Sequence, residues 1–127
     1  MSDSARAQRF ADALQTFESS GDSADLLDQF AEDAELTRPE ADRSDSETDA
    51  AAFWDAYLAQ FDSIQTSFAA VEEAGNRGIL EWLSTGSLST GRNVDYRGVS
   101  LLTFDANDKV SRFATYYDTA AFLEPGA

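Results

Sequence analysis

Apolar residues recur at helical spacing through the first half of the chain. Phe10, Leu14 and Phe17 lie three or four positions apart, and Gly21 follows them. This spacing predicts a first helix with one apolar face. Gly21 is expected to end it, because glycine readily adopts the backbone conformation that closes a helix.

A second, shorter helix is predicted after Asp22 or Ser23, since either side chain can cap a helix N-terminus. Its apolar face holds Leu26, Leu27 and Phe30. A short strand is then predicted over residues 34–37. Residues 39–45 are polar, begin with a proline and show no periodicity, so we expect a mobile loop there.

The clearest helical pattern begins at Ser44 or Ser46. Its apolar residues follow one another at i, i+3, i+4, i+7, i+8 and i+11, which is the spacing of a helix with one buried face. They are Ala50, Phe53, Trp54, Tyr57, Leu58 and Phe61. Three helices are therefore expected before any long strand.

Four runs of alternating apolar and polar residues fill the second half of the chain. They cover residues 63–73, 78–87, 93–104 and 109–117. Short links with turn residues separate them, so neighbouring runs are expected to pair as antiparallel strands. Helices followed by such strands predict an α+β fold, with the helices packed on one face of a curved sheet. The curvature leaves room for a pocket between the two layers.

The length and charge of the chain limit its class and its partners. A chain of 127 residues corresponds to one domain over 1–127. It has 24 acidic residues against nine basic ones, for a net charge of −15. Such a surface repels nucleic acids and anionic membranes, so neither is expected as a partner. With Lys109 as its lone lysine, the chain is typical of halophilic proteins, although an ordinary acidic protein would share this balance.

The chain contains neither cysteine nor histidine. This composition excludes disulfides, thiol catalysis, the Ser-His-Asp triad and the usual metal ligands. Residues 105–108 are expected to form a turn rather than a calcium loop, so we predict no metal and no cofactor. The first residues lack the apolar run of a secretory signal, and no segment reaches the ~20 apolar residues that span a bilayer. We therefore expect a cytoplasmic protein.

Several short motifs in the second half resemble one known family. They are Gly-Ile-Leu-Glu-Trp-Leu-Ser-Thr-Gly at 78–86, Gly-Arg at 91–92, Arg-Gly-Val-Ser-Leu-Leu-Thr-Phe at 97–104, Asp-Lys-Val at 108–110 and Tyr-Tyr-Asp at 116–118. In order and spacing they resemble the SnoaL-like branch of the NTF2-like superfamily. The resemblance implies a cone-shaped α+β fold with a pocket between helices and curved sheet, and a homodimer formed through the sheet. It also implies a function among isomerases, cyclases, epoxide hydrolases, dehydratases and non-catalytic binders.

Asp118 is the candidate acid/base that this resemblance implies, because polyketide cyclases of the family place an aspartate at the end of the last strand. A carboxyl in an apolar pocket has a raised pKa and can move a proton beside a ketone. Tyr116 shares a strand face with Asp118, and its hydroxyl could donate to a developing oxyanion. A structural alternative stays open for each: Asp118 as the cap of a C-terminal helical turn, and Tyr116 as a buried aromatic residue.

Trp54, Tyr57 and Trp82 are expected to line a pocket for a flat apolar ligand. Asp95 and Arg97 share a strand face and could join Asp118 there, since the epoxide-hydrolase branch uses two aspartates and an arginine. Here they stand in the reversed order Asp-x-Arg, and a surface ion pair is the alternative.

The sequence thus predicts a domain that binds a small apolar or polyketide-like molecule. It would act either as a cofactor-free isomerase, cyclase or hydrolase, or as a non-catalytic module that binds a ligand or forms a dimer.

Overall fold

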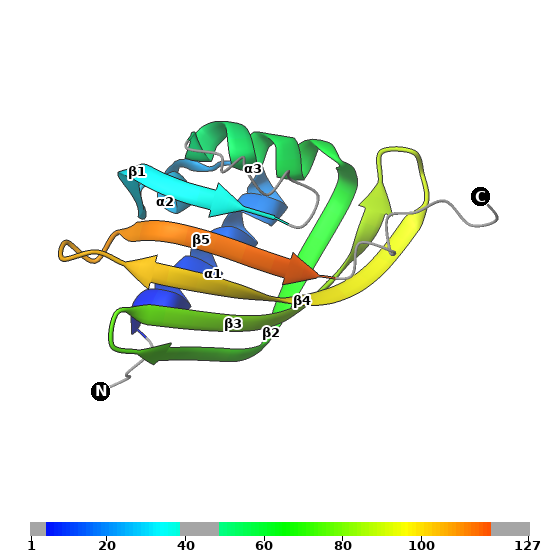
Figure 1. Cartoon of the computed structure of the whole chain (residues 1–127). Helices are drawn as coiled ribbons and strands as arrows, with labels where there is room; N and C mark the ends of the chain where they lie inside the picture. The colour runs from blue at the N-terminus through cyan, green and yellow to red at the C-terminus, as the bar shows by residue number, and fades with distance from the viewer. Residues whose placement is uncertain (1–4, 39–48, 118–127) are drawn as a thin grey trace.

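The computed structural model describes residues 5–38 and 49–117, and it shows three helices and five strands in this part of the chain. In chain order the elements are α1 (Ala5–Ser20), α2 (Ala24–Leu27), β1 (Phe30–Thr37), α3 (Ala50–Ala59), β2 (Phe61–Ala74), β3 (Arg77–Leu88), β4 (Asn93–Phe104) and β5 (Val110–Tyr117). The helices pack against one face of a curved, open sheet (Figure 1), which confirms the α+β prediction. The loop expected at 39–45 and the candidate Asp118 lie outside the described residues.

The sheet is mixed, with the strand order β1-β5-β4-β3-β2. Strands β2 to β5 form an antiparallel meander, as the short turns between the alternating runs predict. The edge strand β1 pairs in parallel with β5, so the first and last described strands lie side by side (Figure 1). The turn at 105–108 is held by the Asp105 side chain, which accepts hydrogen bonds from the backbone N–H groups of Asn107 and Lys109.

Two element boundaries differ from those predicted from the sequence. Phe30 was expected on the face of the second helix, but it begins strand β1 and pairs with Val110. Phe61 was expected in the third helix, but it begins β2 and pairs with Leu88. In both cases an apolar residue at a helix end gains a strand partner that sequence spacing alone does not reveal.

Helix α3 begins later than predicted, at Ala50 rather than near Ser44 or Ser46. Its cap is Asp49, whose side chain accepts a hydrogen bond of 3.2 Å from the backbone N–H of Ala52. This bond satisfies one of the N–H groups that a helix N-terminus leaves without an intrahelical partner.

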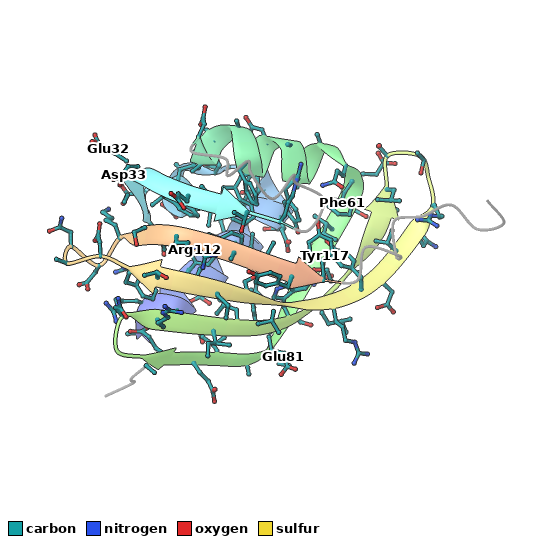
Figure 2. All side chains as sticks on the ribbon, in the orientation of Figure 1. Glu32, Asp33, Phe61, Glu81, Arg112 and Tyr117 are labelled. Carbon is teal, nitrogen blue, oxygen red and sulfur yellow. The ribbon has the colours of Figure 1, made fainter. Side chains whose placement is uncertain are left out.

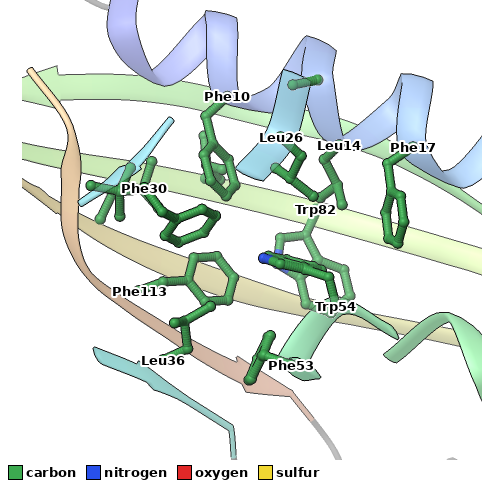
Figure 3. Close-up of a cluster of buried hydrophobic side chains, with 14 of the residues drawn as sticks. Phe10, Leu14, Phe17, Leu26, Phe30, Leu36, Phe53, Trp54, Trp82 and Phe113 are labelled. Atoms are coloured by element: carbon green, nitrogen blue, oxygen red, sulfur yellow. The ribbon is translucent and has the colours of Figure 1, made fainter. Parts of the chain in front are cut away.

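An aromatic cluster forms the centre of the core between α1, α3 and the sheet (Figure 3). Its hub is Phe113 of β5, which is 3% exposed. The Phe113 ring centroid lies 5.6 Å from that of Phe10, 5.9 Å from that of Phe53 and 5.2 Å from that of Trp54. The cluster joins α1 and α3 to the concave face of the sheet. This face also carries the candidate site.

Glu73, near the end of β2, binds the first residues of helix α1 through its carboxylate. One carboxylate oxygen accepts a 2.9 Å hydrogen bond from the backbone N–H of Ala7, and the other accepts a 2.7 Å bond from Arg6 Nε. Arg6 also donates to the backbone oxygen of Gly75, in the turn between β2 and β3. A carboxylate at a helix N-terminus is favoured by the helix dipole, so Glu73 sets the position of α1 over the sheet.

Candidate functional site

A small cavity of about 40 Å³ lies between α1, α3 and the concave face of the sheet. Its apolar walls come from Leu14, Phe53, Trp54, Tyr57, Trp82, Tyr96, Phe113 and Tyr117. Four hydroxyl side chains and one arginine complete the lining: Thr66, Ser84, Ser100, Thr115 and Arg38. An apolar wall with a few polar groups that converge on it is the usual composition of a small-molecule site.

The four hydroxyls come from four adjacent strands, at positions where the alternation turns the side chain inward. Thr66 of β2 pairs with Ser84 of β3, and Ser100 of β4 pairs with Thr115 of β5. All four side chains are buried. Composition and motif spacing did not identify these four residues as site residues. A signal was present, because Ser84 follows the inward-facing Trp82 by two positions and must share its face.

The position of the Trp82 side chain on the concave face of the sheet is set by Gly98 and by the hydroxyl groups of Ser100 and Thr115. It pairs in register with Gly98, and its indole lies so close that a Cβ added at Gly98 would sit 2.6 Å from Trp82 Cζ2. The indole N–H donates a 2.9 Å hydrogen bond to Ser100 Oγ, and the Ser100 and Thr115 hydroxyl oxygens are 2.8 Å apart. Gly98 therefore makes the space for the ring, and Ser100 fixes its orientation.

A second polar group borders the cavity beside α1, and it includes the half-buried carboxyl of Glu18. Glu18 Oε1 accepts a 2.8 Å hydrogen bond from the Thr66 backbone N–H. Glu18 Oε2 accepts from the Tyr57 hydroxyl at 2.5 Å and from Thr66 Oγ1 at 2.7 Å. Thr66 Oγ1 lies 2.6 Å from Ser84 Oγ, so the chain of hydrogen bonds reaches from the carboxyl to the cavity wall.

Burial changes the acidity of both titratable members of this group. Burial raises the pKa of Glu18 above its ordinary value, and the hydrogen bonds from Tyr57 and Thr66 oppose the shift in part. Burial also raises the pKa of Tyr57 well above its ordinary value, and the nearby charge of Glu18 adds to the effect. The phenol of Tyr57 therefore stays protonated, while Glu18 can exchange a proton at a pH closer to neutrality than an exposed glutamate can.

One donor in the lining is left without a partner. The indole N–H of Trp54 is buried and makes no hydrogen bond within the described residues. At the partly exposed side of the cavity, the Arg38 guanidinium lies over the Phe53 ring, with its central carbon 5.6 Å from the ring centroid. These two groups give the cavity a donor and a positive charge that a ligand could use.

The structure places Trp54, Tyr57 and Trp82 in the lining of the cavity, where the sequence analysis expected them. Glu81, the neighbour of Trp82 in β3, is exposed on the opposite face of the sheet (Figure 2).

The structure corrects the expected positions of Tyr116, Asp95 and Arg97. Tyr116 is 52% exposed on the outer face of the sheet, and its neighbour Tyr117 lines the cavity instead. Asp95 and Arg97 are also exposed, because the apolar residues Val94 and Tyr96 occupy the inward positions of β4. No ion pair joins Asp95 to Arg97 in the structure as described.

Neither a metal cluster nor a membrane-spanning helix is found in residues 5–38 and 49–117. No three carboxylates there gather closely enough to hold a metal ion. No helix there combines the length and the apolar character needed to cross a membrane.

Comparison with solved structures finds the same fold in several proteins. An NTF2-like protein of unknown function from Burkholderia pseudomallei is 17% identical, with a TM-score of 0.79 over 96% of this chain and 95% of its own. TerC, co-crystallised with polyporic acid, is 17% identical, with a TM-score of 0.76 over 92% of this chain and 95% of its own. An LEH-like epoxide hydrolase from Mycobacterium tuberculosis is 9% identical, with a TM-score of 0.71 over 94% of this chain and 88% of its own.

No curated protein matches the chain. The family comparison gives a match over residues 7–113, which covers nearly all of α1, the other two helices and the sheet as far as Phe113 of β5. The chain belongs to the family of SnoaL-like domains.

Proposed function

We propose that this protein binds a small, flat and largely apolar molecule in the cavity under α1 and α3. The observation that carries the proposal is the buried N–H of Trp54, which has no hydrogen-bond partner among the described residues and lies in a mostly apolar wall. Leaving such a donor without a partner costs about 1–3 kcal/mol, and a ligand oxygen that accepts its hydrogen bond would remove this cost. A ligand with a carbonyl or similar acceptor at its rim fits this requirement.

The volume of the cavity indicates that its walls must adjust when a ligand binds. A space of about 40 Å³ has room for no more than a few water molecules. Small-molecule pockets usually measure about 300–1,000 Å³. Arg38 is the one charged side chain among the described lining residues, and it is partly exposed. We expect it to move aside and then to contact a partial negative charge on the ligand.

Two relatives of the same fold support a small-molecule role, since TerC was crystallised with polyporic acid and the mycobacterial protein is an epoxide hydrolase. Their low identity to this chain supports the fold rather than a particular reaction.

The binding proposal can be tested with 1-indanone, a flat bicyclic ketone, and with indane, which lacks the carbonyl. The chain has two tryptophans, and both line the cavity, so their fluorescence reports on its occupancy. We expect 1-indanone to bind about fivefold more tightly than indane, because its oxygen satisfies the Trp54 N–H. The Trp54→Phe variant should lose most of this preference.

Tyr116→Phe is the matched control for this experiment, because Tyr116 lies on the outer face of the sheet. Its binding should equal that of the unaltered protein. Equal affinity for the two compounds in the unaltered protein, or binding of neither, would contradict the proposed function.

Within this proposal the reaction is cofactor-free isomerisation, cyclisation or hydrolysis, with Asp118 as acid/base. Exchange of the α-hydrogens of 1-indanone in D₂O, followed by NMR, measures proton abstraction directly. We expect the protein to accelerate this exchange and Asp118→Asn to reduce the acceleration by about 10²-fold or more, the range for a general base. Acceleration that survives the substitution would rule Asp118 out.

The alternative is a non-catalytic module in which Asp118 caps a helix. Exposed apolar residues on the outer sheet face favour a role of this face in pairing two copies. They are Ile79, Leu83 and Tyr116, exposed by 41%, 37% and 52%. No acceleration of the exchange, a fall in stability on Asp118→Asn and a dimer by light scattering would together favour this alternative.

A further inference from the structure

Glu18 lies outside the site predicted from the sequence, at the wall between the cavity and the solvent. On one side it borders an open groove formed by α1, the first half of β2 and the residues Thr85 and Gly86 of β3. On the other side its hydrogen-bond partners Tyr57 and Thr66 line the cavity. Thr66 lines both spaces, so it forms part of the wall between the groove and the cavity.

The hydrogen bonds around Glu18 have a defined direction when its carboxyl is ionised, because a carboxylate can only accept. The hydroxyl protons of Tyr57 and Thr66 then both point at Glu18 Oε2. Since Thr66 has used its one proton, the proton between Thr66 and Ser84 belongs to Ser84. Ser84 is thereby left with only lone pairs to offer to the cavity, so the wall accepts hydrogen bonds.

The hydroxyls of β4 and β5 in the lining have the reverse character. Ser100 accepts the Trp82 N–H, and the Ser100–Thr115 pair holds two hydroxyl protons but uses one of them in its mutual hydrogen bond. One proton remains to be donated, and the Trp54 N–H is a second free donor among the described residues. The cavity therefore has an accepting wall at Ser84 and a donating wall at Trp54 and the Ser100–Thr115 pair.

We propose that Glu18, acting through Thr66 and Ser84, is a positioning residue that makes the cavity select ligands carrying an O–H or N–H donor on one edge and an acceptor on the other. Hydroxyaryl ketones, hydroxyquinones and enols of diketones have this arrangement. The proposal rests on the proposed function, because it concerns the same cavity. It adds the polarity of the ligand and the group that sets it.

Protonation of Glu18 would remove the selection. A protonated carboxyl can donate to Thr66 Oγ1, which lets Thr66 donate to Ser84 and Ser84 donate into the cavity. Burial raises the pKa of Glu18, so this change takes place at a higher pH than it would in an exposed glutamate. The titratable groups that face Glu18 in the described residues are Tyr57 from α3, which stays protonated, and Asp62 of β2, which shares the groove.

The test uses 2-naphthol, which donates one O–H, and 2-methoxynaphthalene, which has the same rings but no donor. Neither compound ionises between acidic and neutral pH, so any pH dependence belongs to the protein. Equilibrium dialysis from acidic to neutral pH should show 2-naphthol affinity rising about fivefold as Glu18 ionises. The affinity for 2-methoxynaphthalene should stay constant.

Two variants locate the effect. Glu18→Gln cannot ionise, and Thr66→Val breaks the hydroxyl link but keeps the backbone N–H that donates to Glu18. Both should bind 2-naphthol with no pH dependence, while in Thr66→Val the titration of Glu18 remains visible by ¹³C NMR of its carboxyl. Glu81→Gln makes the same charge change on the exposed outer face and should behave as the unaltered protein.

A rise in 2-naphthol affinity that persists in Thr66→Val, or that 2-methoxynaphthalene shares, would overturn the role of Glu18. A flat profile in the unaltered protein would do the same. In each of these cases the cavity still binds flat molecules, so the proposed function stands. Failure of both compounds to bind would instead contradict the proposed function, and the selectivity would fall with it.

Discussion

Phe113→Ala is expected to lower the free energy of unfolding by about 3–5 kcal/mol, the usual cost of truncating a buried phenylalanine. Phe113 is 3% exposed, and its ring stacks on Phe10 and packs against Phe53 and Trp54. Removing it leaves a void at the point where α1, α3 and β5 meet, next to the cavity that Phe113 already lines. Small domains have a total stability of about 5–15 kcal/mol, so a large part of it would be lost.

Urea unfolding followed by circular dichroism measures this loss. Tyr116→Ala is the matched control, because it removes an aromatic ring from the same strand but from the exposed outer face. Its cost should stay within about 1 kcal/mol. If the two variants lose similar amounts, Phe113 is not the hub that its ring contacts indicate.

Gly98→Ala is expected to destabilise the protein by about 3 kcal/mol, at the upper end of the usual cost of overpacking. The added Cβ would lie 2.3 Å from the backbone oxygen of Tyr116 and 2.6 Å from Trp82 Cζ2. The oxygen belongs to the neighbouring strand and cannot move without disturbing the pairing of β4 with β5. The Trp82 ring must therefore tilt, which also changes the floor of the cavity.

Gly78→Ala provides the comparison for this variant. There the nearest atoms belong to the Phe104 and Leu102 side chains, at 3.2 and 3.3 Å, and side chains can shift more cheaply than backbone. We expect less than half the loss in the urea midpoint, and a change in tryptophan fluorescence only for Gly98→Ala. An equal loss in the two variants would mean that Gly98 does not hold the space for Trp82.

The sequence pattern predicted the elements well where a long stretch keeps one period. The apolar face of α1 and the four alternating runs agree with the structure because each spans many residues. Phe30 and Phe61 could not be assigned in this way. Each stands at the end of a helical pattern, and the strand partners Val110 and Leu88 that decide their conformation lie far away in sequence.

The site was predictable only as far as strand faces could be compared. Alternation showed that Asp95 and Arg97 share a face, but the side that this face takes depends on Val94 and Tyr96, which bury more apolar surface. Tyr116 and Tyr117 follow one another in the sequence and are equally apolar, so their burial could not indicate which of the two faces the cavity. The strand register decides which tyrosine faces the cavity. Tyr117 pairs with Gly98, so its ring lies on the same face of the sheet as the Trp82 ring.

The sequence pattern could not predict a role of Glu18 in the site, for a different reason. It follows Phe17 on an amphipathic helix, where a glutamate usually marks the solvated edge. Its partners Tyr57 and Thr66 lie in α3 and β2, and only the packing of three separate elements brings their hydroxyls to one carboxyl.

The parallel pairing of β1 with β5 affects how the protein reaches this fold. Phe30 is translated well before its partner Val110, because a long stretch of sequence separates the two. Until then the edge of β1 has no neighbour and the floor of the cavity is incomplete. Pairings between distant segments form slowly, since the intervening chain must be ordered first. Closure of the first described strand against the last is therefore expected to be a late step in folding.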